Sequence, residues 1–194
     1  MNQAASPAIA ALRSATAPLH ALLEQSIHIA RPGAGRSQYA AYVGALWGWL
    51  APIEQSMWSA AWPEGAHAAD RAVKSGWLAE DIQAARADGF LAGEIATRAP
   101  QQFDSLASRA GWAYVVEGSM LGAEVLERRL GPALRPWPAH WLHGYGDAGA
   151  ARWREFLAVL GESVTSARDV ELCARGGAQA FESIGEWMRA RGAA

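Results

Sequence analysis

The sequence predicts an all-α protein, a single-domain helical bundle, and three observations lead to that prediction. Apolar residues recur with the 3.6-residue period of a helix along most of the chain. The alternation of β-branched and aromatic residues that is typical of strands never extends beyond a few positions. The length of 194 residues, 51% of them hydrophobic, suits one compact core, and no repeat or linker divides it. We therefore expect one domain over 1–194.

The first helix is expected over 8–29, where leucines repeat at helical spacing, and the breaker "RPGAG" at 31–35 ends it. Pro18 lies inside this segment and lacks a backbone donor. It either kinks the helix or places the true start near Thr16.

The second helix is expected over 37–60, with Ser37 as its N-cap and "WPEG" closing it. Two short helices should follow, near 67–75 and 79–88.

A long helix is predicted over 102–130, ended by the Gly-Pro pair that follows it. The segment 135–149 is rich in proline, glycine and aromatic residues, and we expect an ordered loop there. Two further helices should cover 150–160 and 164–191.

Composition excludes several classes of protein. The formal net charge of −2 provides no basic surface for nucleic acid. No apolar run approaches the roughly 20 residues of a membrane span, and the N-terminus lacks the apolar stretch of a signal peptide. We therefore expect a cytoplasmic protein without a nucleic-acid or membrane partner. The single cysteine, Cys173, excludes an internal disulfide, and we expect a half-buried helical residue rather than a nucleophile.

Gly118 and Gly122 lie four residues apart inside the predicted long helix. A glycine there costs roughly 1 kcal/mol relative to alanine, so two on one face require an explanation. The flanking residues are too polar for a transmembrane helix pair. Two occupants of the resulting slot remain, a closely packed neighbouring helix or a flat ligand, and glycine would also let the helix bend. Spacing alone favours the neighbouring helix.

His20 and Glu24 lie one turn apart on the first predicted helix. A histidine that binds a metal usually donates its other ring N–H to a carboxylate or carbonyl, and Glu24 is placed to accept it. Arg13 lies two turns earlier, about 10.5 Å along the helix, and could meet an anionic group at the edge of a ligand whose metal sits over His20. The alternative is a surface His–Glu pair, which this pattern alone favours.

Three segments carry longer motifs. The stretch "LRSATAPLHALLEQS" (12–26) has the pattern Leu-(Arg/Lys)-x-x-Thr-x-x-x-His-x-x-x-Glu, and "YVVEGSMLGAEVLERRLG" (114–131) contains Glu-Gly-Ser-x-x-Gly-(Ala/Gly). The stretch "HGYGDAGAARWREFLAVL" (143–160) has the pattern Tyr-Gly…Trp-x-x-Phe-x-x-x-Leu. In order, spacing and extent, these segments resemble the heme oxygenase family, especially its bacterial branch.

The resemblance implies heme held between a proximal helix and a kinked distal helix. His20 falls on the family's proximal iron ligand, and Glu24 falls on the carboxylate that orients it. Gly118 and Gly122 fall on the distal glycines, which let the helix cross the porphyrin closely and confine O2. Ala123 replaces a glycine found in many members, and its methyl group is expected to tighten the pocket.

Ser119 departs from the animal-type members, which carry an aspartate that organises distal water and supplies protons. A serine hydroxyl can hold water but is not an acid near neutral pH, so we hypothesise that protons arrive through water ordered by Ser119. For the heme propionates we choose Arg13 first, followed by Tyr114 and Arg175. Lys74, the only lysine, lies far in sequence from every motif and receives no role.

The implied activity is the oxidative opening of heme to biliverdin with release of iron and carbon monoxide. Heme would be both substrate and cofactor, and O2 the co-substrate. The chain has no glycine loop typical of nucleotide or flavin sites, so electrons are expected from a separate ferredoxin or NAD(P)H-dependent reductase. Two settings fit equally: bilin supply to a bacteriophytochrome, or iron acquisition from captured heme.

Three other functions stay open. A heme carrier or sensor would keep His20 without turnover. A thiaminase-like enzyme could use the same helical scaffold, but it would need a cysteine nucleophile, and Cys173 has no base beside it in sequence. A helical adaptor without a ligand would leave the His–Glu and glycine pairs unexplained.

Overall fold

The computed structural model describes residues 6–194, and every regular element in that range is helical, which confirms the predicted all-α class. Residues 1–5, the start of the segment considered for a signal peptide and of the expected 1–194 domain, lie outside the described residues. The α-helices are α1 (Pro7–Ser26), α2 (Arg36–Ser59), α3 (Ala68–Arg71), α4 (Lys74–Ala87), α5 (Leu106–Leu134), α6 (His140–His143), α7 (Gly149–Ser163) and α8 (Ala167–Ala190). Two short 3-10 helices complete the chain, η1 (His28–Ala30) and η2 (Gly146–Ala148).

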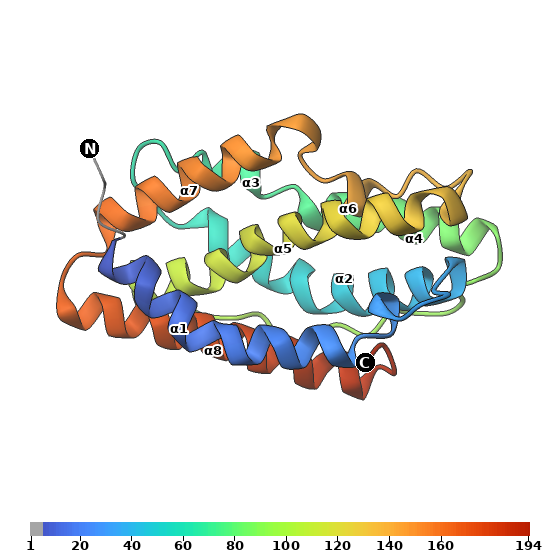
Figure 1. Cartoon of the computed structure of the whole chain (residues 1–194), viewed down its shortest axis with the longest axis horizontal. Coiled ribbons are helices and arrows are strands. Elements are labelled where there is room, and N and C mark those ends of the chain that lie inside the picture. Colours follow the sequence, from blue (N-terminus) through green and yellow to red (C-terminus); the bar gives the residue numbers. More distant parts are fainter. Residues whose placement is uncertain (1–5) are drawn as a thin grey trace.

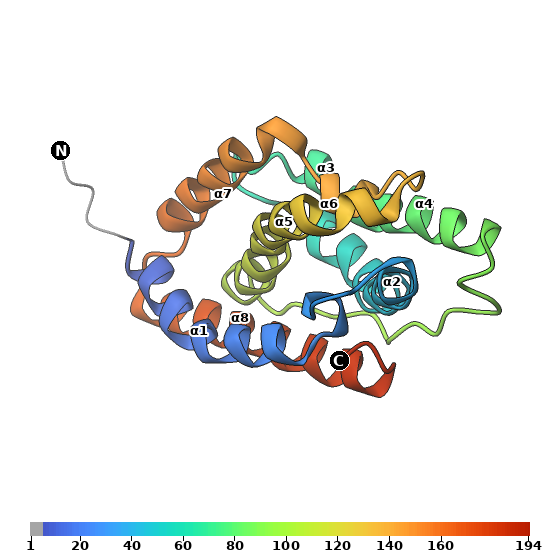
Figure 2. The same ribbon diagram turned by 45° about the vertical axis from the view of Figure 1, so that its right-hand side comes forward.

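The first and last helices lie side by side, and α8 also packs along α5 (Figures 1 and 2). Helices α1 and α5 each pack against α8, but they make little direct contact with each other. Helix α2 packs against α4, and α6 lies against both α4 and α5. Figure 2 shows the axis of α5 changing direction near its middle.

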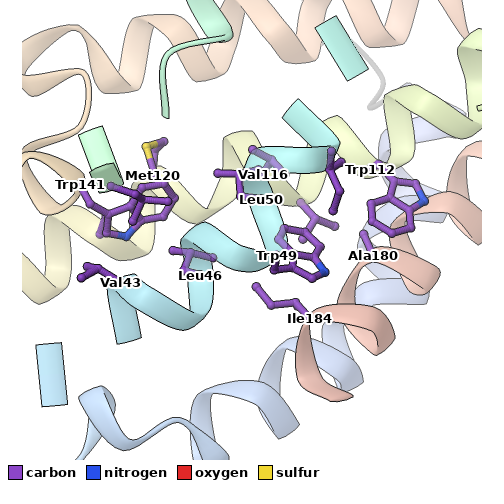
Figure 3. Close-up of a cluster of buried hydrophobic side chains, with 14 of the residues drawn as sticks. Val43, Leu46, Trp49, Leu50, Trp112, Val116, Met120, Trp141, Ala180 and Ile184 are labelled. Carbon is purple, nitrogen blue, oxygen red and sulfur yellow. The ribbon is translucent and has the colours of Figure 1, made fainter. Parts of the chain in front are cut away.

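The hydrophobic core lies where α2, α5 and α8 meet (Figure 3). Trp49 of α2 stacks on Trp112 of α5, with ring centroids 5.9 Å apart and planes inclined by 14°. Trp141 of α6 is 1% exposed and is part of the same cluster. The buried aromatic rings supply much of the apolar area that stabilises the fold.

Glycines bring α8 unusually close to both of its neighbours. A Cβ atom at Gly111 of α5 would lie 2.1 Å from the carbonyl oxygen of Cys173, and one at Gly176 of α8 would lie 2.4 Å from that of Ser108. A Cβ atom at Gly177 would lie 2.7 Å from Cδ2 of Leu12 in α1. A side chain at Gly111 or Gly176 would meet backbone atoms and force α5 and α8 apart, whereas one at Gly177 would displace the Leu12 side chain.

Two helix boundaries predicted from the sequence are wrong because each helix contains a proline that does not interrupt it. Helix α1 begins at Pro7 and runs through Pro18, so the alternative start near Thr16 is wrong. Helix α5 runs through Pro132 to Leu134, so the expected end at 130 is also wrong. Both prolines are exposed, and solvent can satisfy the carbonyl group that each leaves without its helical donor.

Side-chain caps explain the remaining differences at helix starts. Gly35, not Ser37, caps α2, and its N–H donates to Oε1 of Gln38 at 3.0 Å. Ser105 caps α5 by accepting from the N–H of Ser108 at 3.1 Å, so α5 begins later than the predicted 102. Helix α4 begins at Lys74 instead of near 79 because the Glu54 carboxylate accepts from the N–H groups of Lys74 and Ser75, each at 2.9 Å.

The predicted loop 135–149 contains α6 and η2. The buried Asp81 carboxylate accepts from the N–H of His140 at 2.7 Å and of Trp141 at 2.9 Å, which fixes the start of α6. The last two predicted helices agree with α7 and α8 to within three residues at each end. Among residues 6–194, no helix has both the length and the apolar character that crossing a membrane requires.

Replacing Asp81 with alanine should destabilise the protein strongly. The carboxylate also accepts from the Tyr39 hydroxyl at 2.5 Å, so three buried donors would lose their partner, at a cost of about 3 kcal/mol in total. Urea denaturation of the variant and of the exposed control Asp104→Ala measures the difference. Equal unfolding free energies for the two variants would contradict this role for Asp81.

Candidate functional site

His20 lies on the exposed side of α1, next to α8. Its Nδ1 atom is 3.4 Å from Oε2 of Glu24, and the two side chains are 57% and 65% exposed. The edge of the Phe181 ring from α8 meets the imidazole, with centroids 5.6 Å apart and planes at 76°. The helical spacing thus brings His20 and Glu24 together as predicted, and Nε2 is the ring nitrogen directed away from Glu24.

Gly118 and Gly122 have different surroundings from the glycines that pack helices. A Cβ atom at Gly118 would meet only the Trp153 ring of α7, 3.4 Å from Cη2. At Gly122 it would meet no atom of residues 6–194 within 4 Å outside its own helix turn. A neighbouring helix, through the Trp153 ring of α7, thus borders Gly118, but within residues 6–194 no neighbouring helix explains Gly122.

One face of α5 carries four aligned positions. Gly111, Gly118, Gly122 and Arg129 are separated by seven, four and seven residues, which returns each to the same side of a helix. Gly111 packs against the α8 backbone, and the Arg129 guanidinium donates to the carbonyl oxygens of Ile29 at 2.5 Å and Ala30 at 2.9 Å. The face is thus attached to the rest of the protein at both ends, with the glycine pair between them.

The middle of this face is apolar and exposed. Leu121 is 37% and Val125 57% exposed, in a protein that buries most of its large apolar side chains. Apolar side chains and bare backbone on α5, an aromatic edge on α8 and an imidazole on α1 are the groups that a flat, largely apolar ligand with a metal centre requires. The residues present therefore fit heme.

The other predicted distal residues lie at different depths. The Ser119 hydroxyl donates to the carbonyl oxygen of Val116 at 2.7 Å, which leaves its lone pairs free to accept. Tyr114 is half-buried, and its ring lies 5.2 Å from that of Trp153. Ala123 is 3% exposed, so its methyl group faces the core and not the open side of Gly122.

The two predicted propionate-binding arginines lie on different helices. Arg13 is exposed on α1 and forms no ion pair with any of residues 6–194. Arg175 is exposed on α8 and pairs with Glu171 one turn earlier, at 2.5 Å. The structure brings neither arginine into contact with His20.

Sequence reasoning missed a buried cluster of charges beneath the glycines. The Lys74 amine donates to Oε1 of Glu117 at 2.6 Å, to the Tyr145 hydroxyl at 2.7 Å and to the Arg71 carbonyl at 3.0 Å. The Arg71 guanidinium pairs with the other oxygen of Glu117. Lys74 is distant in sequence but contacts the Glu-Gly-Ser motif in space. The one signal available was a glutamate inside an otherwise apolar stretch of helix.

Burial shifts the protonation of this cluster. It lowers the pKa of the Lys74 amine below its ordinary value, and the adjacent Glu117 carboxylate opposes that shift. Burial and the same carboxylate raise the pKa of the Tyr145 hydroxyl. Tyr145 therefore stays neutral, and the Lys74 amine and the Arg71 guanidinium both lie at hydrogen-bond distance from Glu117.

Cys173 is completely buried, not half-buried as expected. It lies on α8 where Gly111 crosses, and burial raises the pKa of its thiol to about 12. A thiol in this position cannot act as a nucleophile at neutral pH.

Comparison with known proteins agrees with this geometry. The sequence profile of the heme oxygenase family matches residues 6–190. A protein named heme oxygenase from Xanthomonas campestris pv. campestris (strain 8004) is 38% identical over 99 residues, which cover 49% of this chain and 59% of that relative. Because the profile match runs over almost the whole chain, the protein belongs to the heme oxygenase family.

Proposed function

We propose that this protein opens heme oxidatively to biliverdin, with release of iron and carbon monoxide. The observation that carries the proposal is Gly122, a helical glycine at which an added Cβ would meet no atom of residues 6–194 within 4 Å outside its own helix turn. Packing within the described residues does not explain the cost of that glycine, roughly 1 kcal/mol, whereas a ligand lying against the backbone does. Heme fits the groups around it.

His20 would hold the heme iron through Nε2. Glu24, 3.4 Å from Nδ1, would keep the proton on that nitrogen and orient the ring, and the Phe181 edge would limit its rotation. Gly118 and Gly122 would let the α5 backbone approach the porphyrin. When bound, heme supplies the iron at which O2 reacts, and the protein contributes position and access to protons.

Ser119 would order water on the distal side. Because its hydroxyl proton is directed to Val116, it would act as an acceptor toward that water. Ala123 would act from the core by holding α5 in place. Arg13, Tyr114 and Arg175 remain our candidates for the propionates, and Arg175 would have to leave Glu171.

We further propose that residues 1–194 act as one domain in the cytoplasm. Electrons would come from a separate ferredoxin or NAD(P)H-dependent reductase. The bilin product would pass to an acceptor such as a bacteriophytochrome, or the reaction would serve to acquire iron from captured heme. These points follow from the family resemblance.

The direct test compares wild type with His20→Ala. Anaerobic heme titration should give a Soret band for wild type and at least tenfold weaker binding for the variant, since the iron loses its axial ligand. Adding O2 with ascorbate or a reductase should convert the wild-type complex to biliverdin and carbon monoxide. His143→Ala is the matched control, because His143 also lies 3.4 Å from a glutamate and is 66% exposed.

Two results would contradict the proposal. Equal heme binding by wild type and His20→Ala would remove His20 as the ligand. A Soret band that stays unchanged under reductant and O2 would favour a carrier or sensor. Product analysis by mass spectrometry distinguishes biliverdin from nonspecific bleaching.

Gly122→Ala should separate stability from ligand binding. The added methyl group meets open space, so the unfolding free energy should stay the same or rise by up to about 1 kcal/mol. Heme binding should weaken, because the methyl group occupies the ligand's position. Gly76→Ala in α4 is the control, since a Cβ there also meets no neighbour within 4 Å. Unchanged heme affinity in Gly122→Ala would remove Gly122 from the site.

Cys173 should resist iodoacetamide in the native protein. With a pKa of about 12, only about one thiol in 10⁴ is ionised at pH 8. Labelling followed by mass spectrometry should show modification only after unfolding in urea. Rapid labelling of the native protein would revive the thiaminase-like alternative.

A further inference from the structure

One buried guanidinium connects the two residues that precede Gly118 and Trp153. Arg71 is fully buried, and its Nη1 pairs with the Glu117 carboxylate. Its Nη2 donates to the carbonyl oxygen of Arg152 at 2.9 Å, and its Nε donates to that of Ala66 at 2.7 Å. Arg71 thus ties α3 to α5 directly before Gly118 and to α7 directly before Trp153.

The Trp153 ring occupies the space next to Gly118. Its Cη2 atom would lie 3.4 Å from a Cβ atom at Gly118, and it supplies the only atoms that such a Cβ would meet within 4 Å outside its own helix turn, among residues 6–194. The ring also stacks on Phe156 at 6.0 Å and lies 5.2 Å from Tyr114. Trp153 is only half-buried, so part of this residue remains accessible.

Arg71 is itself held firmly. Lys74 and Tyr145 contact the Glu117 carboxylate alongside it, and the Arg71 guanidinium lies 5.4 Å from the centre of the Phe156 ring. Separating a buried ion from its partner strongly destabilises the folded protein, so the Arg71 side chain is held in this position. The planar fork of arginine serves three acceptors in fixed directions, which a lysine ammonium cannot reproduce.

We propose that Trp153 forms part of the wall against which heme lies, and that Arg71 is a positioning residue that sets the Trp153 ring over Gly118. The inference rests on the proposed function. Arg71 touches no part of the ligand and acts through the backbone of α5 and α7. The Trp153 ring, together with Gly118, then limits how far the porphyrin can slide toward α7.

The first test uses protein labelled with 5-fluorotryptophan, whose ten tryptophans give separate ¹⁹F resonances. The Trp153 resonance is the one missing in Trp153→Phe. In wild type, paramagnetic ferric heme should shift or broaden this resonance more than that of the buried Trp49. In the heme-free Arg71→Lys variant, the same resonance should move because the ring has lost its support.

Arg109 and Trp62 provide a matched control. Arg109 is 7% exposed, donates to the carbonyl of Ala61, directly before Trp62, and lies 4.9 Å from the Trp62 ring centre. Like Arg71, it donates to the carbonyl oxygen directly before a tryptophan, but that tryptophan does not border Gly118. Arg109→Lys should move the Trp62 resonance and leave heme oxidation within twofold of wild type.

The second test is a double-mutant cycle on the rate of heme oxidation and on the ratio of biliverdin isomers. Arg71→Lys and Trp153→Phe should each change the isomer ratio at least threefold, and the double variant should match Trp153→Phe alone, because Arg71 acts through that ring. Heme affinity should stay within about threefold in all three, since the iron ligand is intact.

The outcomes separate this inference from the proposed function. Heme binding without a response of the Trp153 resonance would overturn the inference and leave the proposed function intact. Additive effects in the cycle would reduce Arg71 to a structural role. Absence of a Soret band in wild type would overturn both. Should Arg71→Lys fail to fold, the response of wild-type Trp153 to heme still decides whether the ring lines the site.

Discussion

The structure depends on the close contact of α8 with its two neighbours, α5 and α1. At Gly111 and Gly176 the backbones of α5 and α8 approach so closely that no side chain fits between them, and Gly177 leaves room for the Leu12 side chain of α1. This contact sets the position of α5 on one side of α8 and of α1 on the other. Because α1 and α5 share little contact of their own, the separation between His20 and the Gly118–Gly122 face follows from where α8 holds each helix.

Glycine thus has two opposite uses in one helix. At Gly111 the missing side chain is filled by another backbone, and the close packing offsets the loss of helix propensity. Eleven residues later, at Gly122, nothing within the described chain fills the space, and the loss is uncompensated in the heme-free protein. The same loss lies beside exposed Leu121 and Val125, and this combination is the basis of the proposed heme site.

Buried charged side chains hold the neighbouring helices together in the same region. Arg71, Lys74 and Glu117 are buried together, and their mutual attraction offsets a desolvation cost that each would otherwise meet alone. Ion pairs of this kind contribute little net stability but allow few alternative arrangements. Here they join α3, α4, α5 and the segment carrying Tyr145 directly before Gly118 in the chain.

The sequence alone determined what short-range spacing controls: the all-α class, the His20–Glu24 pair one turn apart, and the shared face of Gly118 and Gly122. Helical geometry makes these relations local. Tertiary structure decided the rest. It brought Lys74 to Glu117, buried the Ala123 methyl in the core, and used Glu54 to start α4 at Lys74. It also left Gly122 uncovered while Gly111 was packed. These outcomes depend on contacts between residues far apart in the chain, which local periodicity does not encode.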